Sequence, residues 1–211
     1  MFGEHLKDVR GLMEIYRYQT NFKHKKRTVA EHSWFVSKVA HGLAIWEKNK
    51  FGNEVDIEKV LFLAISHDIG ECFIGDILTT TKKMSPIIKE ELNRIEGVVF
   101  KEHILKTIPN SWGPQYLNLH EEISSLKTIE SRIVKAADII DRIFECMEEI
   151  ELNNKNPYES ILRNDIITLY DMDIISVKYF LKYPIKDIGA EIYIKKEIQD
   201  ALDSIDFSPY F

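Results

Sequence analysis

Apolar residues recur along most of this chain at the spacing of one buried helix face, and this periodicity constrains the fold more than any other feature. Between residues 31 and 47 they follow the 3, 4, 7 spacing of an amphipathic helix, at Phe35, Val36, Val39, Ala40, Leu43, Ala44 and Trp46. Sustained strand-type alternation and internal repeats are missing from the sequence. The pattern therefore predicts an all-α fold, a compact multi-helix bundle.

Five further helices are predicted from the same spacing. Their approximate bounds are residues 60–68, 87–105, 128–152, 166–181 and 188–202. The first of these reaches His67 and Asp68, and we expect it to end near Gly70, because glycine can supply a left-handed terminal conformation. Ser85 followed by Pro86 is typical of an N-cap and a first helical position, so this pair marks the start of the next helix.

Length and composition fit one globular domain. The chain has 211 residues, 45% of them hydrophobic and 29% charged, and a chain of this size buries roughly 70% of its unfolded surface without a disulfide. We predict a single domain over residues 1–211. Its metal-site core spans about 12–153, where Pro109 and residues 112–114 interrupt the helical pattern, and a C-terminal helical extension spans about 154–211.

Charge and cysteine usage narrow the partners and the compartment. The net charge is −6, so duplex nucleic acid is not expected as the main partner. A basic run at residues 23–27 is either a solvated loop or a surface that faces an anionic small molecule. The two cysteines form no C-x-x-C pair, and the N-terminus lacks the layout of a signal peptide. With no apolar run of roughly 18 residues, we expect a cytoplasmic protein without a membrane segment.

Three places in the helical framework carry residues that bind metals. They are His32 at the start of one predicted helix, His67-Asp68 at the end of another, and Asp138 among apolar neighbours in a third. Adjacent histidine and aspartate side chains can reach one ion, and a distant histidine and aspartate would complete a site of two nitrogens and two oxygens. Each residue alone is compatible with a structural role. The order of the set along the chain favours a metal site.

This set resembles the signature of the HD-domain superfamily of metal-dependent phosphohydrolases, and its surroundings resemble the bacterial 5′-deoxynucleotidase branch. Three stretches carry the narrower resemblance. Arg17-Tyr18 stands where that branch has an Arg-Trp pair, residues 67–71 resemble its His-Asp-x-x-Glu, and residues 75–79 resemble its Gly-Asp-Leu-Pro-Thr. The likeness covers roughly residues 12–153, and it implies an HD-domain bundle.

The resemblance implies a metal site with one divalent ion per subunit, Mn²⁺, Co²⁺ or another transition metal. Its ligands would be His32, His67, Asp68 and Asp138. Four protein ligands on an octahedral ion leave two positions, one for a phosphate oxygen and one for water, whose pKa the metal lowers.

The resemblance also implies the catalytic and substrate-binding groups. Arg17 would orient the phosphate through its planar fork, and Tyr18 would lie against the sugar. Glu71 would position or deprotonate the attacking water. The sugar side would be held by Asp76, Ile77, Leu78 and Thr79, with Asp76 also counted as catalytic, and the ligands Asp68 and Asp138 would contact substrate as well.

Some of these roles have alternatives, and two positions depart from the pattern of the branch. Glu71 is also compatible with a partner that holds a ligand histidine, and Arg17 with a surface salt bridge. Tyr18 replaces a tryptophan associated with rejecting a 2′-hydroxyl, and Leu78 replaces a proline. These departures concern the choice of substrate and leave the metal site intact.

The sequence thus predicts a phosphohydrolase that removes the 5′ phosphate from deoxynucleoside monophosphates. One alternative is hydrolysis of deoxynucleoside triphosphates at the same site, which the basic run slightly favours. Another is a non-catalytic, nucleotide-sensing module, although Arg17, Glu71 and Asp76 all stand beside the ligands in the sequence. The expected partner is a small deoxynucleotide, and the resemblance favours a homodimer.

Overall fold

The computed structural model describes residues 2–19, 22–78, 81–82 and 84–210, and these residues are predominantly helical. They contain no β-strand, and an isolated antiparallel bridge joins Tyr16 to Thr28. The all-α prediction is confirmed. Within the described residues, no helix combines the length and the apolar character needed to span a membrane.

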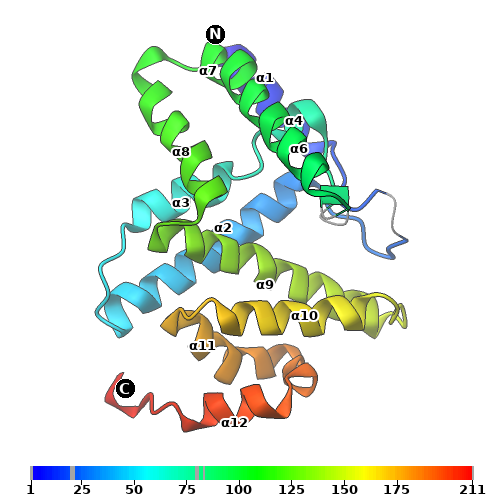
Figure 1. The fold of residues 1–211 in the computed structure, drawn as a ribbon, viewed down its shortest axis with the longest axis vertical. Helices are drawn as coiled ribbons and strands as arrows, with labels where there is room; N and C mark the ends of the chain where they lie inside the picture. The colour runs from blue at the N-terminus through cyan, green and yellow to red at the C-terminus, as the bar shows by residue number, and fades with distance from the viewer. Residues whose placement is uncertain (1, 20–21, 79–80, 83, 211) are drawn as a thin grey trace. The chain divides into compact units, whose positions relative to one another are not determined.

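The elements follow one another in the order drawn in Figure 1. The α-helices are α1 Phe2–Arg10, α2 Val29–Ile45, α3 Ile57–Ser66, α4 Glu71–Ile74, α6 Pro86–Val99, α7 Leu105–Thr107, α8 Gly113–Ser125, α9 Ile129–Glu151, α10 Tyr158–Asp171, α11 Ile175–Lys182 and α12 Lys196–Ser204. Turns of π-helix follow α2 and α6, at Trp46–Lys50 and Phe100–Ile104, and 3₁₀ turns lie at Gly11–Met13, Asn110–Trp112, Pro184–Ile188, Glu191–Tyr193 and Ser208–Tyr210.

The chain forms two compact units. The first comprises Met1–Phe22, Lys26–Trp34 and Ile65–Ser125, and the second comprises Lys23–Lys25, Phe35–Ala64 and Leu126–Phe211. Helices α1, α4, α6, α7 and α8 belong to the first unit, and α9 to α12 belong to the second. That residues 1–211 make one domain, with a core at 12–153, stays a prediction.

In the first unit, α1 packs against α4 and α7. A small apolar core forms where the π-helical turn meets α8, and its buried members include Val99, Phe100, Ile104, Tyr116 and Leu119. In the second unit, α9 and α10 lie side by side (Figure 1). The two helices bury Ile133, Ile140, Ile143, Leu162, Ile166 and Leu169, each less than 2% exposed. Burial of each such side chain contributes about 1.5–3 kcal/mol.

Capping residues place the helix starts where the sequence predicts them. The Ser85 hydroxyl oxygen accepts a hydrogen bond from the Ile87 N–H at 3.2 Å, and Pro86 opens α6. The helix then continues through its π-helical turn to Thr107, close to the predicted end at residue 105. Likewise the Thr128 side chain accepts from the Ser131 N–H, so α9 matches the prediction for residues 128–152.

The predicted end of the second helix was wrong. α3 ends at Ser66, and Gly70 is right-handed, with φ −64°. The left-handed glycine is Gly75, with φ 73° after α4. Helix α4 begins at Glu71, directly after this turn. The chain therefore passes from α3 into α4 without a left-handed residue at Gly70.

The C-terminal helix bounds were also wrong. The predicted helix at residues 166–181 is two helices, since Asp173 between α10 and α11 has φ 52°. Aspartate tolerates this left-handed conformation better than most residues do. Similarly, the left-handed Gly189 ends the turn at Pro184–Ile188, so α12 begins only at Lys196.

Helix α8 lies where the sequence pattern indicated an interruption. It starts at Gly113 and carries Pro114 in its first turn. Proline is tolerated there because the first N–H groups of a helix have no intrahelical acceptor. Residues 112–114 therefore mark a helix start rather than a helix break.

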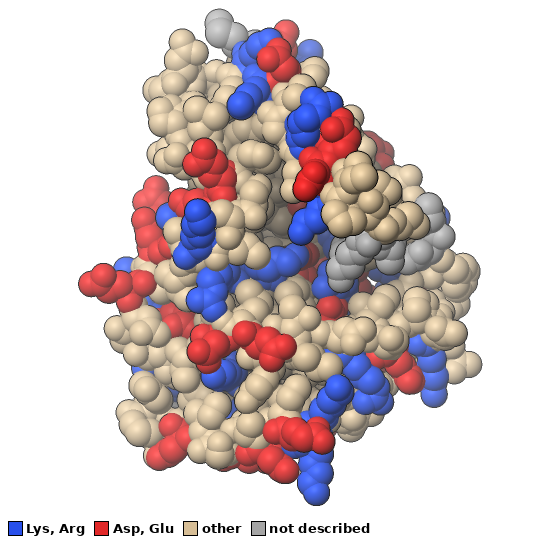
Figure 2. Space-filling model, viewed as in Figure 1, with Lys and Arg blue, Asp and Glu red and all other residues tan. Residues whose placement is uncertain are grey.

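An ion pair joins α9 to α10 within the second unit. Nε and Nη2 of Arg142 donate to the Asp165 carboxylate, at 2.7 and 2.6 Å, and the Asp165 side chain is 7% exposed. On the face shown in Figure 2, by contrast, acidic and basic side chains intermingle at the surface. In the exposed Glu91–Arg94 pair of α6, both side chains are more than half exposed.

We therefore expect unequal costs for losing these two carboxylates. Asp165→Ala leaves the Arg142 guanidinium without its partner and should lower the free energy of unfolding by about 3 kcal/mol. Glu91→Ala removes a solvated pair and should cost less than about 1 kcal/mol. Urea denaturation of both variants measures the difference, and equal losses would contradict the structural role of the Arg142–Asp165 pair.

Candidate active site

Reciprocal hydrogen bonds fix the start of α2, which carries His32. The Thr28 N–H donates to Glu31 Oε2 at 2.7 Å, and the Glu31 N–H donates to Thr28 Oγ1 at 3.2 Å. This is a capping box, and its Thr-x-x-Glu signature is visible in the sequence, although the helix start was not predicted from it. The hydrogen bonds from the Thr28 backbone and hydroxyl lower the pKa of Glu31. His32 follows in the first turn and is 1% exposed.

His67 and Asp68 lie in the turn that directly follows α3. The Ile69 N–H donates to Ser66 O at 3.1 Å, and the Glu71 N–H donates to Asp68 O at 2.9 Å. These two bonds wind the chain tightly from α3 into α4. Three functional groups therefore leave the backbone within five residues, those of His67, Asp68 and Glu71.

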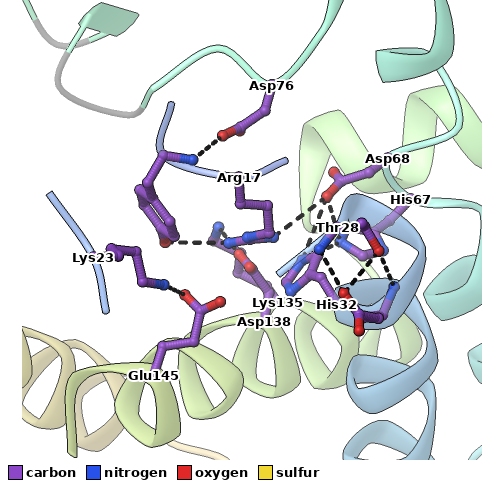
Figure 3. Close-up of polar contacts among 12 residues, drawn as sticks. Arg17, Lys23, Thr28, His32, His67, Asp68, Asp76, Lys135, Asp138 and Glu145 are labelled. Carbon is purple, nitrogen blue, oxygen red and sulfur yellow. Dashed lines mark hydrogen bonds and ion pairs between the residues drawn. The ribbon is translucent and has the colours of Figure 1, made fainter. Parts of the chain in front are cut away.

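Three of the four predicted metal ligands converge in the first unit. His32 Nε2 lies 3.2 Å from His67 Nε2, and Asp68 Oδ2 lies 3.4 Å from the first nitrogen and 3.1 Å from the second. Figure 3 shows the three side chains pointing toward one another. The sequence places these residues at separate points of the chain, and the structure brings their donor atoms together.

The spacing of these donors fits a divalent metal ion. Neighbouring ligands with bonds of about 2.1 Å stand about 3.0 Å apart in octahedral geometry and about 3.4 Å apart in tetrahedral geometry. The three observed spacings fall within that interval. Two imidazole nitrogens and one carboxylate oxygen are a donor set suited to Mn²⁺, Fe²⁺, Co²⁺ or Zn²⁺. The residues present therefore fit a transition metal.

The Asp68 carboxylate is anionic in this environment. Burial acts to raise its pKa, but the charge of His67 and the hydrogen bonds from His32 and His67 outweigh burial and hold the pKa well below its usual range. A ligand carboxylate must be deprotonated to bind metal. Asp68 meets that condition without help from the ion.

The fourth predicted ligand, Asp138, lies on α9 in the second unit. Its Oδ2 accepts a hydrogen bond from Lys135 Nζ at 2.7 Å, one turn earlier on the same helix. The side chain is 17% exposed. An aspartate buried without a partner among apolar neighbours would be destabilising. Asp138 avoids this because Lys135 pairs with its carboxylate (Figure 3).

Arg17 is held next to the ligand cluster. Its N–H donates to Arg27 O at 2.9 Å, beside the Tyr16–Thr28 bridge that precedes α2. Its Nη1 lies 3.8 Å from Asp68 Oδ2. The surface-salt-bridge alternative was wrong, because Arg17 is only 8% exposed. A buried guanidinium beside the ligands is placed to meet an anion.

Tyr18 has an unusual backbone that Asp76 holds. Its φ of 54° lies in the left-handed region, which a bulky side chain rarely adopts. The Tyr18 N–H donates to Asp76 Oδ2 at 2.7 Å, and its hydroxyl accepts from Arg17 Nη2 at 3.2 Å. Strain of this kind gathers at functional sites. In this structure, Asp76 therefore holds the Tyr18 backbone in place.

The segment predicted to contact the sugar is described only in part. Ile77 and Leu78 are half-buried, and Leu78 O accepts a hydrogen bond from the Lys82 N–H at 3.1 Å. Thr79, the last residue of the predicted motif, lies outside the described residues.

Glu71 is the most perturbed carboxyl near the ligands. Burial, followed by the charges of Asp68 and Asp76, raises its pKa to about 10, and the charges of Arg17 and Lys82 partly oppose this. Its Oε2 is buried and has no hydrogen-bond partner among the described residues. An acceptor in that state is suited to a water molecule or a proton. Lys82 was not predicted from the sequence, which carries no signal for it beyond its position shortly after Asp76.

The basic run is engaged by α9 within the second unit. Lys23 Nζ lies 3.2 Å from Glu145 Oε2, and both side chains are 3% exposed. Figure 3 draws this ion pair. The His24 and Lys25 N–H groups both donate to the Glu149 carboxylate at 3.0 Å. A fully solvated loop is therefore a wrong interpretation for Lys23. Its charge is matched inside the protein.

Comparisons with known proteins found a matching family and several relatives. The family model described as 5′-deoxynucleotidase YfbR-like matches residues 4–188, beyond the limit at residue 153 that the motifs indicated. The 5′-deoxynucleotidase plu3092 of Photorhabdus laumondii is 33% identical over 158 residues, covering 75% of this chain and 79% of that protein.

Solved structures share the fold. An HD-domain phosphohydrolase from Listeria innocua has a TM-score of 0.79 and 30% identity, covering 96% of this chain and 98% of that one. The HD phosphohydrolase DatZ of cyanophage S-2L, solved with dA and one catalytic Zn²⁺ ion, has a TM-score of 0.55 and covers 94% of this chain and 96% of its own. At 15% identity, the second similarity concerns the fold alone.

The raised pKa of Glu71 predicts how the metal-free protein responds to pH. The ordinary pKa is 4.5, and in the folded chain it is about 10. Between these values folding takes up a proton, so this group lowers stability progressively as the pH rises. Glu71→Gln removes the effect, and its stabilisation of the chelator-treated protein should grow from pH 5 to pH 9. Urea denaturation across that range measures it, and a gain independent of pH would contradict the assignment.

Proposed function

The chain belongs to the YfbR-like 5′-deoxynucleotidase family, and from this premise we propose that it is a metal-dependent phosphohydrolase that removes the 5′ phosphate from deoxynucleoside monophosphates. One observation carries the proposal: the donor atoms of His32, His67 and Asp68 converge in a single unit, with the Arg17 guanidinium 3.8 Å from Asp68. The name of the Photorhabdus relative supports a deoxynucleotide as the substrate.

Asp138 is the fourth ligand in this proposal. Its support is the chain order His, His-Asp, Asp, which is that of the superfamily, together with its place on α9 as a half-buried carboxylate. Nitrogen and oxygen donors of this kind do not select one metal, so Mn²⁺, Co²⁺ or another transition metal is proposed, with one ion per subunit. The family resemblance also supports a homodimer in the cytoplasm.

The chemistry divides among the metal and the groups around it. A bound divalent ion supplies Lewis-acid chemistry, because it polarises the phosphate ester and lowers the pKa of coordinated water. Arg17 binds two phosphate oxygens with its fork and holds the phosphorus in line with the attacking water. The water oxygen bonds to phosphorus while the bond from phosphorus to the 5′ oxygen breaks. The leaving 5′ oxygen takes up a proton from solvent, so the products are a deoxynucleoside and inorganic phosphate.

Glu71 handles the proton of the attacking water. In the metal-free chain its pKa of about 10 keeps the carboxyl protonated at neutral pH. Positive charge placed beside Asp68 favours the ionised form, because a nearby opposite charge lowers the pKa of a carboxyl. The ionised Glu71 then accepts the proton from the water through its buried Oε2.

Tyr18 and the segment after Gly75 take the sugar side. The Tyr18 ring lies beside Arg17, with 5.1 Å between the guanidinium carbon and the ring centroid, so phosphate and sugar contacts are adjacent. Asp76 keeps Tyr18 in place, and residues 77–79 complete the contacts in this proposal. Lys23 and Lys25 are paired with glutamates of α9, which weakens the argument for a triphosphate that the basic run at residues 23–27 offers.

Product analysis tests the activity directly. Metal-stripped protein, reloaded with Mn²⁺ or Co²⁺, should release inorganic phosphate from deoxynucleoside monophosphates and act less well on the matching ribonucleotides. The triphosphates serve as the comparison. Turnover of triphosphates alone would move the chain to the triphosphohydrolase class, and no turnover of any nucleotide would support a sensor.

Ligand and base variants should separate metal binding from catalysis. Asp138→Ala should lose the ion and turnover together, whereas Glu71→Ala should keep the ion and lose about 10²- to 10⁴-fold in rate. Asp171→Ala, an exposed aspartate of α10 in the same unit, is the control. Metal content and molar mass are measured on one sample, where one ion per subunit and two subunits are expected. An Asp138→Ala protein with a full complement of metal would remove Asp138 from the site.

A further inference from the structure

Tyr18 lies between the turn at Gly11–Met13 and helix α2, and the carboxylate of Asp76 fixes its backbone. The Tyr18 N–H donates to Asp76 Oδ2 at 2.7 Å. Its φ of 54° is a left-handed value, which a bulky side chain adopts only when its surroundings hold it there. Asp76 therefore helps to set the direction in which the Tyr18 side chain leaves the backbone.

The side chain of Tyr18 meets that of the residue before it in the chain. Its hydroxyl oxygen accepts a hydrogen bond from Arg17 Nη2 at 3.2 Å. Adjacent side chains of an extended segment point to opposite sides of the backbone. The left-handed conformation at Tyr18 breaks this alternation, so the two side chains can meet on one side.

Arg17 is fixed at its backbone, and its guanidinium needs a second anchor. The Arg17 N–H donates to Arg27 O at 2.9 Å, but a long flexible stem separates this point from the guanidinium nitrogens. Arg17 Nη1 lies 3.8 Å from Asp68 Oδ2, which is longer than a hydrogen bond, so this ion pair attracts the guanidinium without fixing its direction. The shorter contact with the Tyr18 hydroxyl is directional.

The Tyr18 hydroxyl orients the guanidinium without cancelling its charge. A tyrosine hydroxyl is an uncharged acceptor, whereas a carboxylate neutralises the arginine that it holds, as Asp165 does for Arg142 in the second unit. Arg17 is buried, so solvent screens its charge only weakly. A guanidinium that is both oriented and charged can bind two oxygens of a phosphate with its planar fork.

We propose that Tyr18 is a positioning residue for Arg17, and that its hydroxyl oxygen holds the guanidinium in the orientation that binds the 5′ phosphate. The inference rests on the proposed function and deepens it, because the ring of Tyr18 serves the sugar there and its oxygen serves the phosphate. Asp76 acts on the phosphate end as well, through the backbone of Tyr18.

Removing this oxygen alone tests the inference in the metal-loaded protein. Tyr18→Phe keeps the ring and should weaken the binding of inorganic phosphate, measured by calorimetry, by roughly 3- to 10-fold, the effect of losing one hydrogen bond. KM for deoxyadenosine 5′-monophosphate should rise by a similar factor. The inhibition constant of deoxyadenosine, which lacks the phosphate, should not change.

Three further variants separate positioning from a general structural effect. Tyr18→Trp should lose phosphate affinity as Tyr18→Phe does, because an indole donates a hydrogen bond and accepts none. Tyr16→Phe removes an equal oxygen from an exposed side chain two residues earlier and should behave as the wild type. Arg17→Lys keeps the charge but loses the fork. In that background Tyr18→Phe should add nothing further, because the two residues act as one unit.

Phosphate binding is measured without turnover, so the inference and the proposed function can fail separately. Unchanged phosphate affinity in Tyr18→Phe would overturn the inference, and it would leave the proposed function standing if the wild type hydrolyses deoxynucleotides. Equal weakening of phosphate and deoxyadenosine binding would also overturn the inference, because it would indicate a distorted site. A wild type that hydrolyses no nucleotide, yet loses phosphate affinity in Tyr18→Phe, would overturn the proposed function alone.

Discussion

Two imidazole nitrogens and one carboxylate oxygen lie within 3.4 Å of one another in this protein, and the surrounding structure serves to hold them there. The histidine of α2 arrives through a capping box that sets where the helix begins. The His-Asp pair lies in a tight turn directly after helix α3. Close donors of this kind repel or compete for protons unless a cation or a shared proton joins them, so their convergence fits a metal site.

Burial and neighbouring charges set the protonation states of the carboxyl groups near these donors. Asp68 is kept anionic by its histidine neighbours, while burial and the adjacent carboxylates raise the pKa of Glu71 to about 10. Opposite states in two nearby carboxyl groups are typical of sites that use one as a ligand and the other as a base. The positive charges of Arg17 and Lys82 oppose the rise in the pKa of Glu71.

Much of the fold and part of the site could be predicted from local patterns. Helices α2, α6 and α9 follow from apolar periodicity and from capping residues such as Ser85 and Thr128, since these signals act within a few residues. The break at Asp173 and the right-handed Gly70 could not be predicted, because aspartate and glycine tolerate several backbone conformations and the neighbouring packing selects one. The same applies to α8, where Pro114 is equally compatible with a loop and with a helix start.

The helical class, the order of the proposed metal ligands and the family all follow from the amino-acid sequence, because each depends on the identity and spacing of residues along the chain. Which charged groups meet depends on how the helices pack. Lys23 pairs with Glu145, Asp76 holds the Tyr18 backbone, and Lys82 pairs with Glu96. Electrostatic and hydrogen-bond energies fall steeply with distance. Pairings between residues that are remote in sequence therefore depend on how the helices pack, which no local pattern encodes.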